Sequence, residues 1–166
     1  MVKPDFEELV ERHSAEIFAY VWRMLRESND AEDCLQETFL RAFRSYRRVR
    51  AGSNYRAWLY KIATNAARSQ WKRRTRSETH SVDLDPEMQA GEMSVADRVE
   101  QQALLAAVTQ AVEALPDQQR AALIMRKYQE LSYAEIAAAL ACSEAAARAN
   151  VYQAVRKLQA QFGVNE

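Results

Sequence analysis

The chain has 166 residues, of which 48% are apolar and only three each are Gly and Pro, and its 23 basic and 23 acidic side chains cancel. This composition favours helix throughout, and the length suits one domain or two small ones. No run approaches the roughly 18 apolar residues that span a bilayer, and the first five residues begin no secretory signal, so we expect a cytoplasmic protein without membrane insertion.

Three helices are predicted in the first half of the chain. Apolar residues recur at helical spacing from Phe6, which predicts a helix that begins near Asp5 and ends before Ser28. Asp30 can cap a second helix. Its inward positions are predicted to be Leu35, Phe39, Phe43 and Tyr46.

A third helix is predicted from about Tyr55 to Arg74, after a basic loop that contains Gly52. Its inward stripe should consist of Tyr55, Leu59, Ile62 and Ala66. The opposite side gathers Tyr60, Lys61, Thr64, Arg68, Trp71 and Lys72, with Trp58 and Asn65 on the flank. Exposed aromatic rings among cations suit single-stranded nucleic acid, because rings stack on unpaired bases and cations follow phosphates. Packing anchors are the alternative for the two tryptophans.

Residues 76–93 lose the helical periodicity and contain Pro86 and Gly91. Helices resume at Ser94, and Leu115-Pro116-Asp117 ends one of them and starts the next. The sequence therefore predicts an all-α protein with two small helical domains. They would be residues 1–76 and residues 95–166, joined by an acidic linker at 77–94.

Charge is strongly segregated along this plan. Residues 36–76 carry 12 basic and 1 acidic side chains, whereas residues 77–100 carry 7 acidic and 1 basic. A basic block of this kind predicts a polyanion site rather than a neutral globule. An ordinary solvated helix face is the alternative reading.

Residues 131–158 carry the sharpest local pattern. Ser132 precedes Glu135 by three residues, as in a capping box, and a short helix to Leu140 should follow. After a turn at Ala141, Ser143 can cap a second helix that extends to about residue 162. This predicts a helix-turn-helix, whose second helix enters the major groove of DNA, although a plain helical hairpin is the alternative.

The second of these helices should point a polar face away from its partner. That face consists of Arg148, Ala149, Tyr152, Gln153 and Arg156. Arg and Gln can pair bidentately with guanine and adenine edges, so this face is the predicted DNA-reading surface.

Three segments together resemble extracytoplasmic-function sigma factors, the group 4 members of the sigma-70 family of RNA polymerase sigma factors. Asp30–Ala42 (DAEDCLQETFLRA) looks like their region 2.2, and Tyr55–Asn65 (YRAWLYKIATN) resembles regions 2.3 and 2.4. Leu115-Pro116 and Leu131–Ala137 (LSYAEIA) resemble region 4. The segments occur in the family's order along nearly the whole chain.

The resemblance implies a role for each segment. The second helix would dock on the β′ clamp helices of core RNA polymerase through Asp33, Gln36, Glu37 and Phe39. The loop with Val49 and the third helix, from Arg56 onward, would read the −10 element and take a non-template base into a pocket near Asn65. The C-terminal helix-turn-helix would read the −35 element and touch the β flap, and an anti-sigma factor is an expected partner.

Three positions depart from the family pattern. Val49 stands where an aromatic residue is frequent, which predicts a shallower base pocket. Ala141 replaces a usual Gly in the turn, where a left-handed alanine costs on the order of 1 kcal/mol. The recognition helix begins with an alanine-rich run, residues 145–150, so we expect weaker or different −35 recognition.

A different class of protein remains open at this point: a helix-turn-helix regulator with an effector-binding bundle, which does not bind core polymerase. An enzyme is a distant third. No nucleophile–base pair, metal-ligand set or phosphate loop can be found in the sequence, and Cys34, Cys142, His13 and His80 are isolated from one another. We therefore expect no catalytic residue, no metal and no cofactor.

Overall fold

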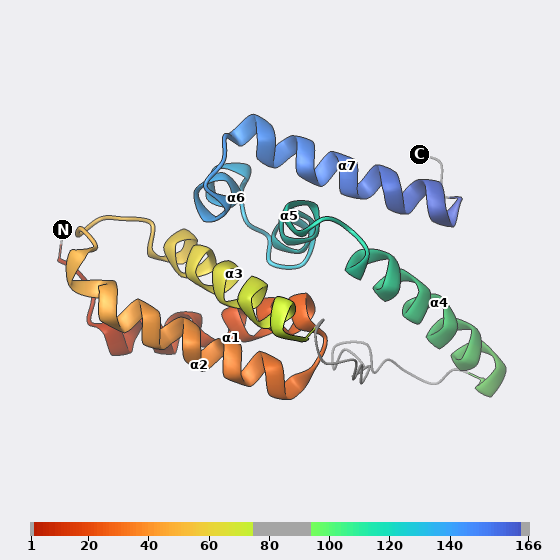
Figure 1. Ribbon diagram of the computed structural model, residues 1–166, viewed down its shortest axis with the longest axis horizontal. Helices are drawn as coiled ribbons and strands as arrows, with labels where there is room; N and C mark the ends of the chain where they lie inside the picture. Colours follow the sequence, from red (N-terminus) through yellow and green to blue (C-terminus); the bar gives the residue numbers. More distant parts are fainter. Residues whose placement is uncertain (1, 75–93, 164–166) are drawn as a thin grey trace.

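The computed structural model describes residues 2–74 and 94–163, and every regular element in these ranges is helical. The first unit contains α1 (Phe6–Leu25), α2 (Ser28–Ser45), the short 3-10 turn η1 (Tyr46–Arg48) and α3 (Tyr55–Arg74). The second unit contains α4 (Val95–Glu113), α5 (Asp117–Lys127), α6 (Tyr133–Leu140) and α7 (Glu144–Phe162). Figure 1 shows α1, α2 and α3 together, with α5, α6 and α7 stacked on the α3 side. The all-α prediction is confirmed.

The cap of α2 differs from the sequence prediction. Glu27, not Asp30, is the N-cap residue, and its carboxylate accepts hydrogen bonds from the backbone N–H groups of Asn29 and Asp30 at 3.1 and 2.6 Å. A Glu side chain is long enough to reach these unpaired donors of the first turn. Asp30 therefore lies inside the helix, where its negative charge favours the positive N-terminal end.

The buried line of α2 is made of small residues, and this changes the predicted packing. Ala31, Cys34, Thr38 and Ala42 are buried. Phe43, predicted to point inward, is 63% exposed. Ala42 occupies the inward position one residue earlier, which lets α2 approach α1 and α3 closely and turns Phe43 to the edge. There its ring meets Phe6 edge-on at 5.3 Å.

The helix-turn-helix forms as predicted. The Ser132 hydroxyl accepts from the Glu135 N–H, and the Glu135 carboxylate accepts from the Ser132 N–H, both at 3.1 Å. Ser143 caps α7 in the same way, through the Ala146 N–H. Ala141 keeps the left-handed conformation, at φ 53°, which the family turn usually gives to glycine.

One apolar core runs through both units. Its buried members from the first unit include Tyr20, Leu25 and Leu59, and those from the second include Ile124, Met125, Leu131 and Ile136. Helix α3 packs on α6, and α1 packs on α5. None of the helices in residues 2–74 and 94–163 combines the length and the apolar character that crossing a bilayer requires.

Candidate nucleic-acid interface

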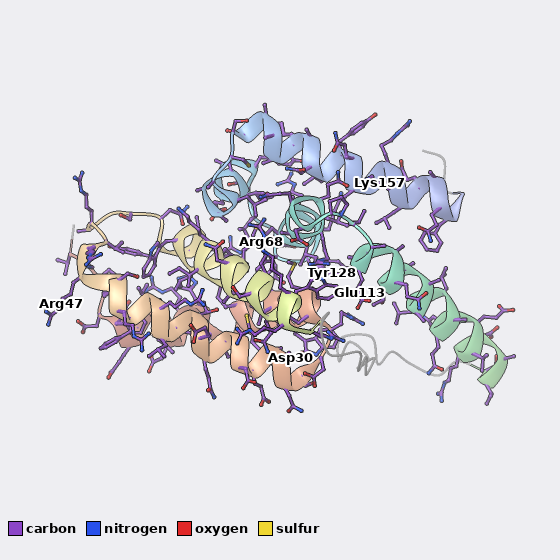
Figure 2. All side chains as sticks on the ribbon, viewed as in Figure 1. Asp30, Arg47, Arg68, Glu113, Tyr128 and Lys157 are labelled. Carbon is purple, nitrogen blue, oxygen red and sulfur yellow. The ribbon has the colours of Figure 1, made fainter. Side chains whose placement is uncertain are left out.

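A polar stripe runs along α3 and faces solvent except at Arg68, which lies beside the second unit. Lys61, Asn65 and Lys72 are exposed and Arg68 is half-buried, at the three- and four-residue spacing that aligns side chains along one helix face. Beyond the N-terminal end of α3, η1 and the following loop add Arg47, Arg48 and Arg50. Figure 2 shows Arg47 at the end of the molecule away from α4, and Arg68 on the side of α3 that faces the second unit.

Tyr60 and Thr64 do not belong to this stripe, which corrects the sequence prediction of their exposure. Tyr60 is fully buried, and its ring lies 5.0 Å from that of Tyr20. The Thr64 hydroxyl is 2.7 Å from the Tyr20 hydroxyl and 2.7 Å from the Tyr60 carbonyl oxygen. The helical projection assumed one buried face, whereas α3 is covered by α1 and α2 and also by α6.

The two tryptophans of α3 are half-buried and have different neighbours. Trp58 joins an aromatic cluster, with its ring 6.1 Å from that of Tyr46, as the packing-anchor alternative supposed. Trp71 lies under the guanidinium group of Arg120, 4.3 Å from the ring centre, so α5 of the second unit covers it. Neither indole offers a fully open face in this arrangement.

Arg56, at the N-terminal end of α3, is held between the two units. Its guanidinium donates to the Glu16 carboxylate at 2.8 Å and to the Gln129 carbonyl oxygen at 2.8 Å, and lies 3.6 Å from the Glu135 carboxylate. Burial of Glu16 opposes ionisation, but hydrogen bonds from His13, Arg56 and Tyr60 outweigh it and lower the pKa of Glu16 to about 2. Val49, at the end of η1, is half-buried.

The outward face of α7 is as the sequence predicted. Arg148, Ala149, Tyr152, Gln153 and Arg156 are all exposed, while Ala147, Val151 and Ala154 are buried. Gln153 accepts a hydrogen bond from Gln119 at 2.9 Å, and Lys157 donates to Gln119 at 2.9 Å. Figure 2 labels Lys157 on α7. Sequence analysis missed Gln119, which lies on α5 outside the motif, and Lys157, which lies on α7 but is not among the five residues predicted to form the DNA-reading face.

Arg148 is oriented by two neighbours. Its guanidinium lies 4.3 Å from the ring centre of Tyr133 and 3.1 Å from the Glu144 carboxylate. Arg126 lies at 4.3 Å from the same ring. Two cations are therefore held at the N-terminal end of the recognition helix, where the helix dipole also favours an anion.

The predicted polymerase-binding residues form a stripe on α2. Asp33 and Gln36 are exposed, and Glu37 is 2.7 Å from Arg41 in a half-exposed ion pair. Phe39 is half-buried, with its ring 6.4 Å from that of Phe6. The same stripe continues into two exposed apolar side chains, because Leu40 is 46% exposed and Phe43 is 63% exposed. Sequence analysis did not include Leu40 in this surface and predicted Phe43 to point inward, since an apolar residue in a helix is expected to be inside.

Two family models match the chain in order. The model of Sigma-70 region 2 matches residues 9–77, and the model of Sigma-70 region 4 matches residues 105–158. The first match contains most of α1 and all of α2 and α3, and the second contains the C-terminal half of α4, all of α5 and α6 and most of α7.

Relatives resemble the chain over most of its length. The chain is 30% identical to the RNA polymerase sigma-H factor of Pseudomonas aeruginosa, covering 92% of this chain and 83% of that protein. It is 31% identical to the RNA polymerase sigma factor CarQ of Myxococcus xanthus, and the match covers 95% of this chain and 89% of that protein. It is also 30% identical to the ECF RNA polymerase sigma factor SigE of Mycolicibacterium smegmatis, but spans only 61% of that protein's length.

A solved structure agrees with the fold of both units. The sigma factor RpoE of Bartonella quintana, crystallised with the anti-sigma factor NepR, superposes with a TM-score of 0.75 at 26% identity, covering 98% of this chain and 99% of that one. The two regions, their order and the shared helical architecture agree. The chain therefore belongs to the sigma-70 family of RNA polymerase sigma factors, in its extracytoplasmic-function group.

Proposed function

We propose that the chain is an alternative sigma factor that brings core RNA polymerase to specific promoters, recognises their −35 and −10 elements and opens the −10 duplex. The observation that carries this proposal is the presence of both sigma regions, in order, in a chain 30% or more identical to sigma factors. The factor itself catalyses no reaction and acts in the cytoplasm. Nothing in the comparisons favours a regulator that does not bind core polymerase.

Opening the −10 element is assigned to residues 1–76. The stripe of Lys61, Asn65, Arg68 and Lys72 would follow the non-template strand. The side-chain amide of Asn65 can donate and accept hydrogen bonds at an extruded base. The arginines at residues 47, 48 and 50 would contact phosphates. Val49 is small and half-buried, which supports a shallow pocket beside them. Five other predicted −10 residues are covered in this arrangement: Arg56, Trp58, Tyr60, Thr64 and Trp71. Of these, Trp58, Tyr60 and Thr64 are proposed to support the stripe from inside the first unit.

Recognition of the −35 element is assigned to residues 95–166. Arg148 and Arg156 carry the charge on the exposed face of α7, and Gln153 and Tyr152 add hydrogen-bonding groups. Ala149 can offer only a methyl group, which suits a thymine methyl. Few polar groups reach base edges here, so −35 recognition should be modest. Residues 77–94 would act as the linker, but nearly all of them lie outside the described residues.

Polymerase docking is assigned to the α2 stripe. The β′ clamp helices would pair through polar groups with Asp33, Gln36 and Glu37, and would also contact Phe39. The second unit would touch the β flap. Leu40 and Phe43 are exposed and continue the same stripe. Apolar side chains inside a polar rim supply most of the binding energy at protein interfaces. We include both in the proposed docking surface.

Replacement of Phe43 tests this docking surface. Burying a Phe side chain is worth about 1.5–3 kcal/mol, so Phe43→Ala should weaken binding to core polymerase roughly tenfold or more. The measurement is a titration of core polymerase with a fluorescently labelled chain. The matched control is Val99→Ala. Val99 is also an exposed apolar residue, 60% exposed on α4, and its variant should bind core polymerase with wild-type affinity. Equal affinities for wild type and Phe43→Ala would remove Phe43 from the surface.

The function as a whole is tested by run-off transcription. Purified core polymerase is mixed with a promoter library, with and without the chain, and specific transcripts should appear only when the chain is present. Absence of binding to core polymerase in a pull-down would contradict the proposal. An anti-sigma partner is also proposed, because the similar RpoE of Bartonella quintana was crystallised with one. Co-purification from the native host would identify it.

A further inference from the structure

Gln119, on α5, forms hydrogen bonds to two residues of α7. Its side-chain amide nitrogen donates to the Gln153 amide oxygen at 2.9 Å, and its amide oxygen accepts from the Lys157 ammonium group at 2.9 Å. Gln153 and Lys157 are four residues apart, which places both on one face of α7, and both are exposed. A residue of α5 is therefore bonded to a residue of the predicted DNA-reading face.

The two helices that carry these side chains pack directly on each other. Leu123, one turn after Gln119, and Ala154, the residue after Gln153, belong to one buried apolar cluster. Their exposed fractions are only 5% and 0%. The backbone positions of the two glutamines are therefore fixed relative to each other, and the bond between them orders only side-chain torsions.

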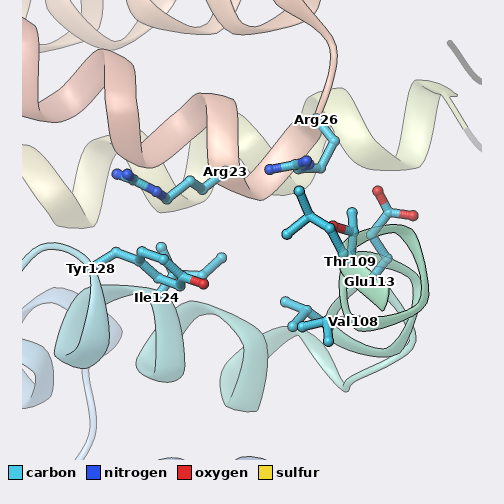
Figure 3. Close-up of a pocket in the computed structure, with 9 residues that line it drawn as sticks. Arg23, Arg26, Val108, Thr109, Glu113, Ile124 and Tyr128 are labelled. Atoms are coloured by element: carbon cyan, nitrogen blue, oxygen red, sulfur yellow. The ribbon is translucent and has the colours of Figure 1, made fainter. Parts of the chain in front are cut away.

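A different face of α5 is turned to the first unit. Figure 3 shows Ile124 of α5, and Tyr128 just after it, beneath Arg23 of α1, where they line a pocket. Gln119 does not line that pocket, and both of its side-chain partners lie on α7. The bonds of Gln119 are therefore internal to the second unit and do not depend on how the two units are placed.

Lys157 determines which way both amides point. An ammonium group can only donate, so the Gln119 oxygen must face it. The Gln119 nitrogen then faces Gln153, and because that nitrogen is also a donor, Gln153 must turn its oxygen toward Gln119. Donor–acceptor pairing thus fixes the orientation of the Gln153 amide from a residue one turn further along α7.

This orientation leaves the N–H groups of Gln153 available. Within residues 2–74 and 94–163 these two donors have no hydrogen-bond partner, whereas the oxygen of the same amide accepts from Gln119. Gln153 therefore presents donors to a molecule that approaches α7. An unconstrained glutamine can turn either end of its amide outward.

The edges of the bases in the major groove distinguish these two cases. An unconstrained glutamine pairs bidentately with adenine, because it donates to N7 and accepts from the N6 amino group. A glutamine that offers donors suits guanine, whose N7 and O6 atoms both accept. Cytosine presents an amino donor there and gives such a group nothing to bond. An amide held as in Gln153 therefore favours guanine over adenine.

We propose that Gln119 is a specificity-determining residue of the −35 site, which acts through Gln153 and, together with Lys157, makes the base opposite Gln153 guanine rather than adenine. Gln119 touches no base itself and is a positioning residue. The inference rests on the proposed function for the identity of the site, because that proposal assigns α7 to the −35 element. One exposed hydrogen bond sets the scale of the discrimination, which should be about three- to tenfold.

Gln119→Glu reverses the orientation and provides the test. A carboxylate can only accept, so it keeps its bond to Lys157 but requires Gln153 to turn its N–H groups inward and its oxygen outward. Duplexes with randomised −35 bases are selected by the full chain bound to core polymerase and, in a second arm, by the full chain alone, and are then sequenced. Wild type should enrich guanine over adenine about threefold or more opposite Gln153, and Gln119→Glu should enrich adenine by a similar factor.

Two controls identify the cause of this change. Gln153→Ala should abolish the base preference at one position, which identifies the base opposite Gln153. In that background Gln119→Glu should not change the guanine-to-adenine ratio, because Gln119 acts only through Gln153. Gln161→Glu adds the same charge at an exposed position of α7. It should lower the affinity for DNA in general but keep the preference for guanine.

The outcomes separate this inference from the proposed function. The same base ratio in wild type and Gln119→Glu, or an adenine preference in wild type, would overturn the role of Gln119. A guanine preference of the chain alone, without any binding to core polymerase, would refute the proposed function and leave the role of Gln119 in base selection standing. Enrichment of no sequence in either arm would refute both.

Discussion

Thr64 and Asn65 are neighbours in the chain but occupy opposite environments. The Thr64 hydroxyl is buried and bonded to Tyr20 and to the Tyr60 carbonyl oxygen, whereas Asn65 is exposed on the polar stripe of α3. Burial raises the pKa of the Tyr20 hydroxyl, so that group stays protonated and depends on its hydrogen bond. One residue therefore serves the core, and the next is available to DNA.

This difference predicts opposite phenotypes for two single substitutions. Thr64→Val keeps the shape but leaves the Tyr20 hydroxyl buried without Thr64 as its partner, which should lower the free energy of unfolding by about 1–3 kcal/mol. Asn65→Ala should leave the unfolding free energy within about 0.5 kcal/mol of wild type. It should reduce promoter opening about tenfold at saturating polymerase.

Urea denaturation measures the unfolding free energy of both variants. The permanganate reactivity of unpaired thymines measures promoter opening. Binding to core polymerase is the control, and both variants should retain it. If Asn65→Ala weakened core binding as much as opening, the assignment of Asn65 to the −10 strand would be wrong.

At the scale of the element, α6 connects the helix-turn-helix to the contact between the units. It has only eight residues, too few to be stable alone, so its ends matter. Glu135 closes the capping box with Ser132 and also lies 3.6 Å from Arg56. Burial raises the pKa of Glu135, but the Ser132 N–H and the charge of Arg56 lower it by more. Its carboxylate is therefore ionised in both roles.

Removal of this cap should be costly for so short a helix. Ser132→Ala removes the hydroxyl that accepts from the Glu135 N–H, and the unfolding free energy should fall by about 1 kcal/mol. Chemical denaturation measures it. Ser143→Ala, which removes the equivalent cap of α7, is the matched comparison and should cost a similar amount. A loss near zero in both would show that solvent replaces these caps without cost.

Much of the element scale was predictable from sequence, because helix ends carry local signals. The capping box at Ser132 and the helix boundary at Pro116 are both predicted from neighbouring residues. The cap of α2 was misassigned because Glu27 and Asp30 both can accept from the first turn. The projection of α3 gave the exposed Lys61 and Asn65 correctly, but failed where a second partner packs on the helix.

At the scale of the whole molecule, no sequence pattern predicts how the two units meet. Gln129 is a single polar residue in a loop, without periodicity or motif, and its partners in the first unit lie 69 and more positions away. Arg120 and Glu16 belong to no motif that the sequence analysis identifies. Contacts of this kind depend on the relative placement of two folded units, which local patterns do not encode.

The whole molecule should respond to acid through Glu16. Its pKa is lowered from 4.5 to about 2, because hydrogen bonds from His13, Arg56 and Tyr60 overcome the cost of burial. A depressed carboxyl pKa contributes stability above the unfolded value, and this contribution disappears as the pH falls through the folded value. Stability should therefore decline between about pH 4.5 and pH 2 in wild type.

Glu16→Gln is the control for this pH dependence. Its unfolding free energy should be lower than that of wild type at pH 7, and the two should converge toward pH 2. Thermal unfolding across this pH range measures both. Parallel pH profiles would show that another carboxylate is responsible.

Trp71 lies beneath Arg120 between the two units, and this position has an optical consequence. Indole emission depends on the polarity around the ring. Among the described residues, Trp71 lies under a cation of the opposite unit, whereas the rings of Trp22 and Trp58 contact Arg26 and Tyr46 of their own unit. Separation of the units exchanges a guanidinium for water over this ring, while Trp22 and Trp58 stay with partners in their own unit. A change in tryptophan emission would therefore report a separation of the two units without an added label.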